Sequence, residues 1–378
     1  MKICMAAPYD ITNSKSWSGT PLSLYSAMKE IDGNDITPFD ISKYHNYFNV
    51  RANILRHLDV TDSFRSKSFV SKLGPSAMNP LNSKILNKHC ASTHYDAVLE
   101  FGGFLPQKNV TPYFIYTDSS NDVKLDYFTR YGELPFGNEG ISVDTFKYAA
   151  DFVRKIYTNA AGVFCMSNWL AESMINTTGV SPEKMHTVYA GANWHGENPP
   201  DEITPKSILQ KKEINLLITG VSYKGKGVDI AVEAVKILNR ESDIRYNLHV
   251  CGISEPYPKN EFVIDYGFIN KSKLIELLNL CDVFVLPSRF DCFGIAFVEA
   301  MTFGLPCVGR NICAMPEIID RGVNGELVDS DDPTELAELI AKICTPQLYS
   351  KYSESAIKKS QKFTWERVAQ DITNVIRK

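Results

Sequence analysis

The sequence predicts an α/β protein with two domains, each built on a parallel sheet covered by helices. The chain has 378 residues, which suits two domains of about 150–200 residues each. Hydrophobic residues make up 44% and charged residues 22%, ordinary values for a soluble globular chain that buries a core. Short apolar runs alternate with longer amphipathic stretches, and this strand–helix alternation implies parallel sheets with crossover helices on both faces.

The strands are predicted from short runs rich in Val, Ile, Tyr and Phe, several of which end in Gly, Pro or Ser. In the first half of the chain these runs are Lys2–Ala7, Asp35–Ile41, Ala97–Phe101, Tyr113–Thr117, Gly162–Met166 and His186–Tyr189. In the second half they are Asn215–Gly220, Tyr246–Gly252, Phe262–Phe268, Asp282–Pro287, Pro306–Gly309 and Gly325–Val328. Helical patterns between and after the strands include Asp229–Leu238, Lys271–Leu280, Pro333–Ile343 and Trp365–Ile376.

A polar, proline-containing segment divides the chain into two blocks. We predict a first domain at residues 1–195, a linker at 196–212 and a second domain at 213–362, because each block has its own strand–helix alternation.

Composition and charge exclude several classes of protein. The net charge of −4 comes from 40 basic and 44 acidic side chains, which removes the electrostatic reason to expect a nucleic-acid binder. The nine cysteines form no C-x-x-C pair and are interpreted as free buried thiols of a reducing compartment. The histidines have no zinc-ligand spacing, so we expect no metal site. No apolar stretch is long enough for a membrane span, and the start MKICMAAPYD is interpreted as a buried strand rather than a signal peptide, which predicts a cytoplasmic protein.

An irregular, basic stretch at residues 51–88 interrupts the strand–helix alternation. It contains seven Lys or Arg and two Asp. The stretch is interpreted as a solvated helical insertion. The alternative is a surface that contacts anionic lipid headgroups at the inner face of a membrane, or an acidic acceptor.

The segment Val285–Arg310 carries the strongest chemical signal. A strand leads into a loop and then into a helix that begins near Phe293 or Gly294. A helix start has unpaired amides and partial positive charge, which favour a phosphate, and Gly294 allows it to approach the backbone. Asp291 and Glu299 flank this turn and are interpreted as ligands of vicinal hydroxyls, because a carboxylate accepts hydrogen bonds from two O–H groups. The alternative is that Glu299 only stabilises its helix start.

A second loop, in Leu216–Val228, lies between a strand and a helix. Its three glycines leave the backbone open, and Lys224 and Lys226 add positive charge. The spacing matches neither the P-loop nor G-x-G-x-x-G, so taken alone the loop also fits a plain turn with surface lysines. Loops at the carboxyl ends of strands converge in a doubly wound sheet, so both loops could hold one diphosphate.

Several motifs together resemble the donor-binding domain of retaining glycosyltransferases of family 4. The family's E-x7-E motif corresponds to Asp291-x7-Glu299 within PSRFDCFGIAFVEAMTFGLPCV, and the segments MPEIIDRGVNGELV, SNWLAESMINTTGVSPEKMHTVYAGAN and GVSYKGKGVDIAVEA also match. The resemblance covers most of residues 151–378 and is weaker over the first 150. It implies the GT-B fold, with two Rossmann-like domains facing across a cleft and a carboxy-terminal helix, residues 363–378, that packs back on the first domain.

The resemblance also implies roles for individual residues. Glu299 is expected on the donor ribose, Asp291 on the transferred sugar, and Lys226 on the diphosphate leaving group. Positive charge stabilises that leaving group, so no metal is required and no cofactor is expected. The residues assigned to donor binding are Glu299, Phe293, Gly294, Ile295, Ala296, Cys292, Lys224, Gly220 and Ser222.

Two positions depart from the family pattern. Asp291 replaces Glu, which moves its carboxylate by roughly 1.5 Å if the backbone stays in place. The usual arginine near residues 221–225 is absent, and Lys224 is the predicted substitute, although lysine supplies a point charge where arginine supplies a planar fork.

The first domain is expected to bind the acceptor. Trp17, Gly19 and Thr20 lie in the first strand–helix loop and are assigned to the acceptor, with an ordinary turn as the alternative. Asp118 follows a strand and is expected to bind an acceptor hydroxyl, and so to act with Asp291 and Lys226 in catalysis. The alternative for Asp118 is a helix N-cap.

These observations predict a retaining, metal-independent hexosyltransferase. It would move a hexose from a nucleotide diphosphate sugar to a hydroxyl of a saccharide or lipid-linked acceptor, in surface polysaccharide or glycan biosynthesis. The alternatives are a nucleotide-sugar epimerase of the same fold and a non-catalytic member that binds nucleotide or a partner. A dehydrogenase is disfavoured because neither half has the G-x-G-x-x-G turn.

Overall fold

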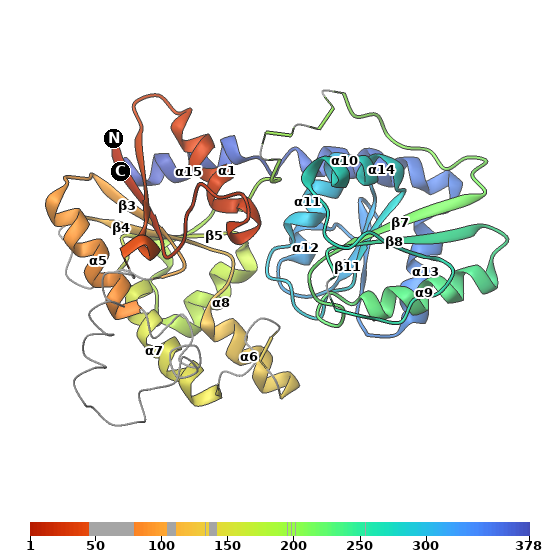
Figure 1. Ribbon diagram of the computed structural model, residues 1–378, viewed down its shortest axis with the longest axis horizontal. Coiled ribbons are helices and arrows are strands. Elements are labelled where there is room, and N and C mark those ends of the chain that lie inside the picture. The colour runs from red at the N-terminus through yellow and green to blue at the C-terminus, as the bar shows by residue number, and fades with distance from the viewer. Residues whose placement is uncertain are drawn as a thin grey trace. The chain divides into compact units, whose positions relative to one another are not determined.

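A computed structural model of the chain divides into two compact units (Figure 1). The first unit contains Met1–Tyr189 and Trp365–Lys378, and the second contains Ala190–Thr364. The structure describes residues 1–44, 79–103, 111–132, 134–135, 142–194, 196–197, 199–200, 202–253 and 255–378. Residues 51–78 of the predicted basic stretch therefore lie outside the described residues, and its last ten residues, 79–88, belong to a described helix.

The first unit contains a parallel sheet in the order β2-β1-β3-β4-β5-β6. Its strands are β1 (Lys2–Ala7), β2 (Asp35–Asp40), β3 (Ala97–Phe101), β4 (Tyr113–Thr117), β5 (Gly162–Cys165) and β6 (Met185–Thr187). Its helices are α1 (Thr20–Lys29), α5 (Asn79–Ser92), α6 (Asn121–Tyr131), α7 (Val143–Asn159), α8 (Asn168–Thr178) and α15 (Trp365–Ile376), with short 3-10 helices at Ser16–Gly19, Ile41–Tyr44 and Pro182–Lys184. The carboxy-terminal helix α15 packs against α1, because its strongly one-sided apolar face buries Trp365, Val368 and Ile372.

The second unit contains another parallel sheet, in the order β12-β11-β10-β7-β8-β9. Its strands are β7 (Glu213–Thr219), β8 (Arg245–Cys251), β9 (Val263–Asp265), β10 (Val283–Leu286), β11 (Cys307–Arg310) and β12 (Gly325–Val328). Its helices are α9 (Val228–Glu241), α10 (Lys271–Leu280), α11 (Ile295–Thr302), α12 (Met315–Ile318), α13 (Pro333–Ile343) and α14 (Pro346–Ser360). Figure 1 shows α9 and α13 on one side of this sheet and α10 and α14 on the other.

The strand order of the second sheet creates one position where ligands are expected. Numbered within the unit, the order is 3-2-1-4-5-6, the order of a Rossmann sheet, and its direction reverses between β7 and β10. These two strands pair in parallel, Val283 beside Leu216 and Phe284 beside Leu217. The loops that follow them therefore begin next to each other at the carboxyl edge.

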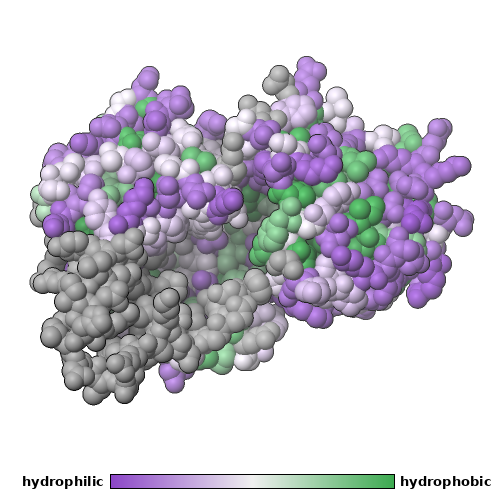
Figure 2. Space-filling model, viewed as in Figure 1, coloured by the Kyte–Doolittle hydropathy of each residue, from purple (hydrophilic) through white to green (hydrophobic). Residues whose placement is uncertain are grey.

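Both sheets are buried on their two faces. The central strands β3, β4, β5 and β10 are buried at every residue, as parallel sheets covered by helices require. Figure 2 shows hydrophilic side chains over most of the described surface on this face of each unit. The nine cysteines, all among the described residues, form no disulfide; eight are buried and Cys313 is partly exposed, so the interpretation as buried thiols is confirmed for eight of them. None of the helices that the structure describes combines the length and the apolar character of a bilayer span.

The units divide earlier in the chain than the predicted domains. The break falls between Tyr189 and Ala190, and residues from 190 onward, including the described part of the predicted linker 196–212, belong to the second unit. Lys206 shows the reason, because its ammonium donates to the carbonyls of Leu278, Asn279 and Cys281 at 2.7–2.8 Å. The segment is polar and proline-rich because it lies along the surface of the second unit.

Candidate functional site

The candidate donor site lies where β7 and β10 end in the second unit. The loop after β7 runs through residues 220–227 into α9, and the loop after β10 runs through residues 287–294 into α11. A backbone bond from Arg289 N to the Gly225 carbonyl (3.0 Å) joins the two loops. The structure therefore brings together the two segments that the sequence singled out separately.

The loops are also joined by an ion pair between Lys226 and Asp291. The distance from Lys226 Nζ to Asp291 Oδ2 is 2.7 Å, and the side chains are 25% and 15% exposed. Gly220 makes room for this lysine, because a Cβ on Gly220 would lie 2.5 Å from Lys226 Cγ. Gly227 has a φ of +69°, and a Cβ there would lie 2.3 Å from the Pro287 carbonyl oxygen. Gly227 is thus needed for the close approach of the two loops, and Gly220 for the position of the Lys226 side chain.

Two other residues of the first loop, Ser222 and Lys224, make contacts within the loop and with the start of α9. Ser222 is buried, and its Oγ accepts a hydrogen bond from Gly225 N at 3.0 Å. Lys224 is exposed, and its Nζ lies 2.8 Å from Asp229 Oδ2. Lys224, the predicted substitute for the family arginine, is therefore directed to an acid at the start of α9.

The start of α11 has the geometry expected of an anion site. Gly294 is its N-cap, with φ +79°, and a Cβ there would lie 2.8 Å from Phe297 Cδ2. No side chain caps this helix. The first backbone bond of the helix runs from Phe297 N to the Gly294 carbonyl (3.0 Å). The amides of Ile295 and Ala296, two partly exposed residues, precede this bond, and amides at that position of a helix favour an anion.

The two residues before this helix start are buried. Cys292 is 8% exposed and Phe293 is 3% exposed. The Phe293 ring packs edge-on against Phe363, with 6.1 Å between the ring centroids. Their side chains hold the loop in place, so the backbone alone is available for the predicted donor contact at these positions.

Glu299 is buried in α11 and forms an ion pair with a lysine. Its Oε1 lies 2.7 Å from Lys271 Nζ, at the start of α10, and accepts a hydrogen bond from Asn193 N at 3.2 Å. The Lys271 ammonium also lies 4.9 Å from the centre of the Trp194 ring. A buried glutamate in the middle of a helix with a lysine from another helix does more than stabilise its own helix start, so the simpler alternative accounts for only part of this arrangement.

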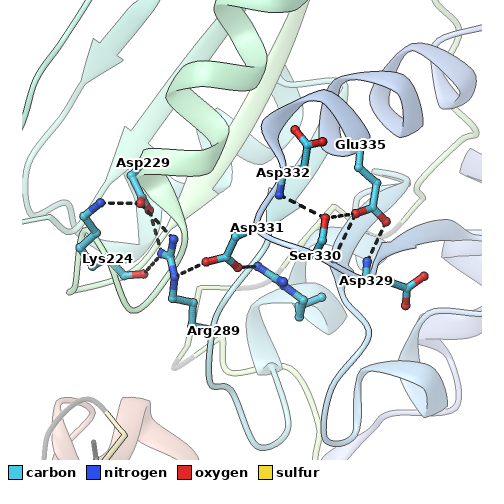
Figure 3. Close-up of polar contacts among 9 residues, drawn as sticks. Lys224, Asp229, Arg289, Asp329, Ser330, Asp331, Asp332 and Glu335 are labelled. Carbon is cyan, nitrogen blue, oxygen red and sulfur yellow. Dashed lines mark hydrogen bonds and ion pairs between the residues drawn. The ribbon is translucent and has the colours of Figure 1, made fainter. Parts of the chain in front are cut away.

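An arginine that the sequence analysis did not single out organises the base of the two loops. Figure 3 shows Arg289 between Asp229, at the start of α9, and Asp331, in the loop before α13. The guanidinium donates to Asp229 at 2.9 and 3.1 Å and to Asp331 at 2.7 Å. It also donates to the Lys224 carbonyl, at 2.5 Å, and Asp331 pairs in addition with Arg310.

These contacts set the charge state of Asp229. Burial alone would raise the pKa of this carboxyl, but the hydrogen bonds from Arg289 and Lys224 outweigh burial and lower the pKa below its ordinary value. Asp229 is therefore ionised near neutral pH. Arg289 sits in the PSRFD segment, but only the fold shows that Asp229 and Asp331 lie beside it.

The predicted acceptor residues of the first unit occupy the loop after β1. Trp17 and Ser18 have positive φ angles of 43° and 54°, and Gly19 follows at 81° as the N-cap of α1. The Trp17 ring, half-buried, lies edge-on to Phe101 at a centroid distance of 6.0 Å. Thr20 is fully buried, so it contributes to the packing of α1. Non-glycine residues in this backbone region are strained, which is common at functional loops.

Asp118 is half-buried and follows β4. Burial and the Asp118 carboxylate together raise the pKa of both Tyr9 and Tyr116, which places these rings close to it. The alternative interpretation of Asp118 as a helix N-cap is wrong, because Ser120 caps α6 by accepting a hydrogen bond from Val123 N at 3.2 Å. Asp118 therefore does not cap this helix, and it lies directly after the carboxyl end of β4.

Within the described parts of the chain, no group of three or more His, Cys, Asp or Glu side chains could hold a metal ion. The candidate donor site consists of backbone amides, two lysine–carboxylate pairs and the Arg289 network. Sequence reasoning missed Lys271 and Arg289, because their carboxylate partners lie at least 28 residues away in the sequence.

Comparisons with known proteins find similarity to glycosyltransferases. Residues 200–363 match the model of the family described as "Glycosyl transferases group 1". An uncharacterized glycosyltransferase of Methanocaldococcus jannaschii is 24% identical over 93% of this chain and 92% of its own length. An uncharacterized 41.2 kDa protein of the cps region of Klebsiella pneumoniae is 29% identical over 43% of this chain, but the match spans only 46% of that relative.

Solved structures share the fold over the whole chain. Sucrose-phosphate synthase from Thermosynechococcus elongatus superposes with a TM-score of 0.72 and 15% identity, covering 100% of this chain and 98% of that one. HepE of Anabaena, solved with UDP and glucose, has a TM-score of 0.62 and 16% identity, covering 100% and 99%. The chain has the two-domain, Rossmann-like GT-B fold, and the comparisons support a group 1 glycosyltransferase.

Proposed function

We propose that this protein is a retaining glycosyltransferase that moves a hexose from a nucleotide diphosphate sugar to a hydroxyl of a saccharide or lipid-linked acceptor. The observation that carries the proposal is the Lys226–Asp291 pair, which joins the two loops at the switch point of the second sheet. A cation and a carboxylate there lie near the start of a helix that no side chain caps, which suits a nucleotide sugar.

Each residue has a defined part in this reaction. The diphosphate lies against the amides of Ile295 and Ala296, and Lys226 exchanges its contact with Asp291 for the diphosphate oxygens. Asp291 is then released to a hydroxyl of the transferred sugar. Glu299 accepts hydrogen bonds from the ribose, with Lys271 holding its carboxylate in place.

In the transfer step the acceptor oxygen forms a bond to the anomeric carbon while the bond from that carbon to the diphosphate oxygen breaks. The acceptor proton passes to the departing phosphate, so retention needs no second carboxylate beside the bond. Lys226 stabilises the charge that develops on the diphosphate. In this proposal the protein's own cations serve the leaving group, with no metal and no cofactor required.

The acceptor is proposed to bind at the carboxyl ends of β1 and β4, where Trp17 offers a half-buried ring and Asp118 a carboxylate. An aromatic face beside an acid suits a sugar, because the ring covers its C–H face and the acid accepts from its hydroxyls. We further propose a cytoplasmic site of action and surface polysaccharide or glycan synthesis as its setting.

Two other functions remain as competing outcomes of experiment. A nucleotide-sugar epimerase would use the same fold and would convert the donor without an acceptor. A non-catalytic member would bind nucleotide without turnover, a possibility raised by Val221 and Lys224 in the loop where the family has its arginine.

The first test is a thermal-shift screen with UDP, GDP, ADP and their sugars, followed by turnover with a panel of acceptors. A stabilising nucleotide, transfer only with an acceptor, and retained anomeric configuration by NMR would support the proposal. A new sugar epimer from the donor alone, or binding without turnover on any acceptor, would contradict it.

A matched pair of variants tests the role of Glu299. Glu299→Gln keeps the size of the side chain but removes the charge, and we expect nucleotide affinity in calorimetry to fall about tenfold with the loss of charged hydrogen bonds to the ribose. Glu276→Gln is the control, since Glu276 is exposed and pairs with Lys273. Equal affinity in the two variants would exclude Glu299 from the donor site.

A further inference from the structure

Two cysteines of the second unit come from neighbouring loops that touch beside the candidate donor site. Cys292 lies just before α11, and Cys313 follows β11, which pairs with β10 in the sheet. The amide of Ala314 donates a hydrogen bond to the Cys292 carbonyl at 3.3 Å. A Cβ on Gly294 would lie 2.8 Å from Met315 Cε. The loop after β11 therefore packs directly on the start of α11.

This backbone bond limits the distance between the two cysteines. Each Cα lies about 2.4 Å from the peptide atom beside it that takes part in the bond, so the two Cα atoms are no more than about 8 Å apart. A disulfide needs about 4.4–6.8 Å between Cα atoms. The separation of Cys292 and Cys313 is therefore inside this range or about 1 Å beyond it at most. The two residues form no disulfide in this structure.

The backbone at Cys313 is unusual for a cysteine. Its φ is +49°, Ala314 follows with φ −80° and ψ −2°, and Met315 N donates to the Ile312 carbonyl at 3.0 Å. This is the pattern of a type II′ turn, whose first central position favours glycine. Strained residues persist where the surrounding structure holds them, and they concentrate at functional sites. Glycine would fit this turn with less strain, so the thiol at position 313 reduces stability.

The exposure of the thiols decides which of them a dissolved reagent reaches first. Cys313 is partly exposed, whereas the eight other cysteines, all within the described ranges, are buried. Cys292 is 8% exposed. Cys4 and Cys90 also have neighbouring thiols, but their mutual hydrogen bond and then burial raise the pKa of Cys4, so that pair stays protonated and shielded. Reaction is therefore expected to begin at Cys313.

We propose that Cys292 and Cys313 form a reversible disulfide that controls the start of α11. The Cys313 thiolate attacks one sulfur of a low-molecular-weight disulfide, which forms a mixed disulfide and releases one thiolate. The Cys292 thiolate then attacks the Cys313 sulfur, which forms the internal disulfide and releases the second thiolate. The two cysteines give up two electrons to the reagent, and their two protons pass to the two released thiolates. An excess of low-molecular-weight thiol reverses both steps.

The consequence for the donor site rests on the proposed function. Cys292 directly follows Asp291 and lies two residues before Gly294, the N-cap of α11. A bridge from the buried Cys292 to the partly exposed Cys313 draws the loop after β10 toward the loop after β11. This movement shifts Asp291, now 2.7 Å from Lys226, together with the amides at the helix start. Oxidation therefore weakens diphosphate binding, and reduction restores it.

The test incubates the full chain in glutathione buffers that range from fully reduced to fully oxidised. Alkylation of the remaining thiols, followed by peptide mass spectrometry, locates the disulfides. We expect one disulfide, between Cys292 and Cys313, that disappears in the reduced buffer. Calorimetry with UDP, GDP and ADP should show that the oxidised chain binds at least about fivefold more weakly to the diphosphate that the reduced chain prefers, with full recovery on reduction.

Two variants separate this pair from the other thiols. Cys313→Gly removes the exposed thiol and places glycine where the turn favours it. We expect this variant to be at least as stable as the parent in denaturant unfolding, to keep the diphosphate affinity of the reduced chain, and to lose both the disulfide and the redox response. Cys344→Ala removes a buried thiol at the end of α13 and should keep both.

Each contrary result overturns a stated part of the proposal. No disulfide in the most oxidised buffer, or one between Cys4 and Cys90 instead, would overturn the redox site, and so would a redox response retained in Cys313→Gly. The expected disulfide with unchanged diphosphate affinity would overturn the control of the α11 start while leaving the proposed function intact. A reduced chain that binds none of the three diphosphates would overturn the proposed function and the control together.

Discussion

The Arg289 network predicts a linked loss of stability and nucleotide binding. Replacing Arg289 with Gln removes two bonds to Asp229, at 2.9 and 3.1 Å, one to Asp331 at 2.7 Å, and one to the Lys224 carbonyl (Figure 3). The first two bonds connect side chains that are 27% and 15% exposed. They therefore dominate the expected effect.

The magnitude follows from these exposures. The two bonds to Asp229, taken together as one bidentate charge-assisted contact, contribute about 1.5–3 kcal/mol when buried. Lys224 still neutralises part of the Asp229 charge in the variant, at 2.8 Å, so the lower end of that range applies. Asp331 is 52% exposed, and its pair with Arg289 adds no more than about 0.5 kcal/mol. We expect a total loss of about 2 kcal/mol in the free energy of unfolding.

The assay is denaturant unfolding of Arg289→Gln beside Arg321→Gln. Arg321 pairs with Asp329 in the neighbouring loop, but both side chains are about half exposed, at 47% and 55%. The control should therefore change stability by less than about 0.5 kcal/mol. Equal stability of the two variants would refute the assignment of the network as a stabilising element.

A second measurement separates stability from loop placement. Arg289 holds the loop that carries Lys226, through the Lys224 carbonyl and the Gly225 carbonyl. In Arg289→Gln we expect nucleotide diphosphate affinity to fall about tenfold in calorimetry at a temperature where the variant stays folded. Arg289→Lys should recover only part of it, since lysine lacks the planar fork. A folded variant with full affinity would limit Arg289 to a structural role.

Two further predictions concern the loops and the second sheet. Gly220→Ala places a Cβ 2.5 Å from Lys226 Cγ, so the ammonium must move and nucleotide diphosphate affinity should fall about tenfold; unchanged calorimetry would show that the lysine has room. Burial lowers the pKa of His249, so at acidic pH the unfolded state binds more protons than the folded state. The free energy of unfolding should therefore fall as the pH drops below about 6.5, and His249→Asn should flatten this slope between pH 7 and 5. A slope unchanged by the substitution would exclude His249 as its source.

Strands were predictable from the sequence because parallel strands covered on both faces are short, almost wholly apolar runs. The structure has Lys2–Ala7, Ala97–Phe101 and Gly325–Val328 at the predicted bounds. The division between the units was not predictable in the same way. A polar segment with prolines looks like a free linker, and only the contacts of Lys206 show that it follows the surface of the second unit.

The sequence selected residues of the candidate site but could not show which side chains they pair with. Asp291 and Lys226 were selected from separate loops, yet their pairing at 2.7 Å depends on the adjacency of β7 and β10. Sequence spacing cannot give that adjacency, because 65 residues separate the two side chains. Arg289 was missed for the same reason, since its two acids come from α9 and from the loop before α13.

The charges of the candidate donor site are balanced before a ligand arrives. Lys226 is held by Asp291, Lys271 by Glu299, and Lys224 shares Asp229 with Arg289. A diphosphate that approaches this site therefore meets cations that already have carboxylate partners, and it gains their charge only by displacing one. Under the proposed function, displacement at Asp291 would release that carboxylate to a hydroxyl of the transferred sugar. A further cation without a carboxylate partner would bind nucleotide without releasing Asp291. The proposed coupling therefore does not need an arginine at residues 221–225, where the family usually has one.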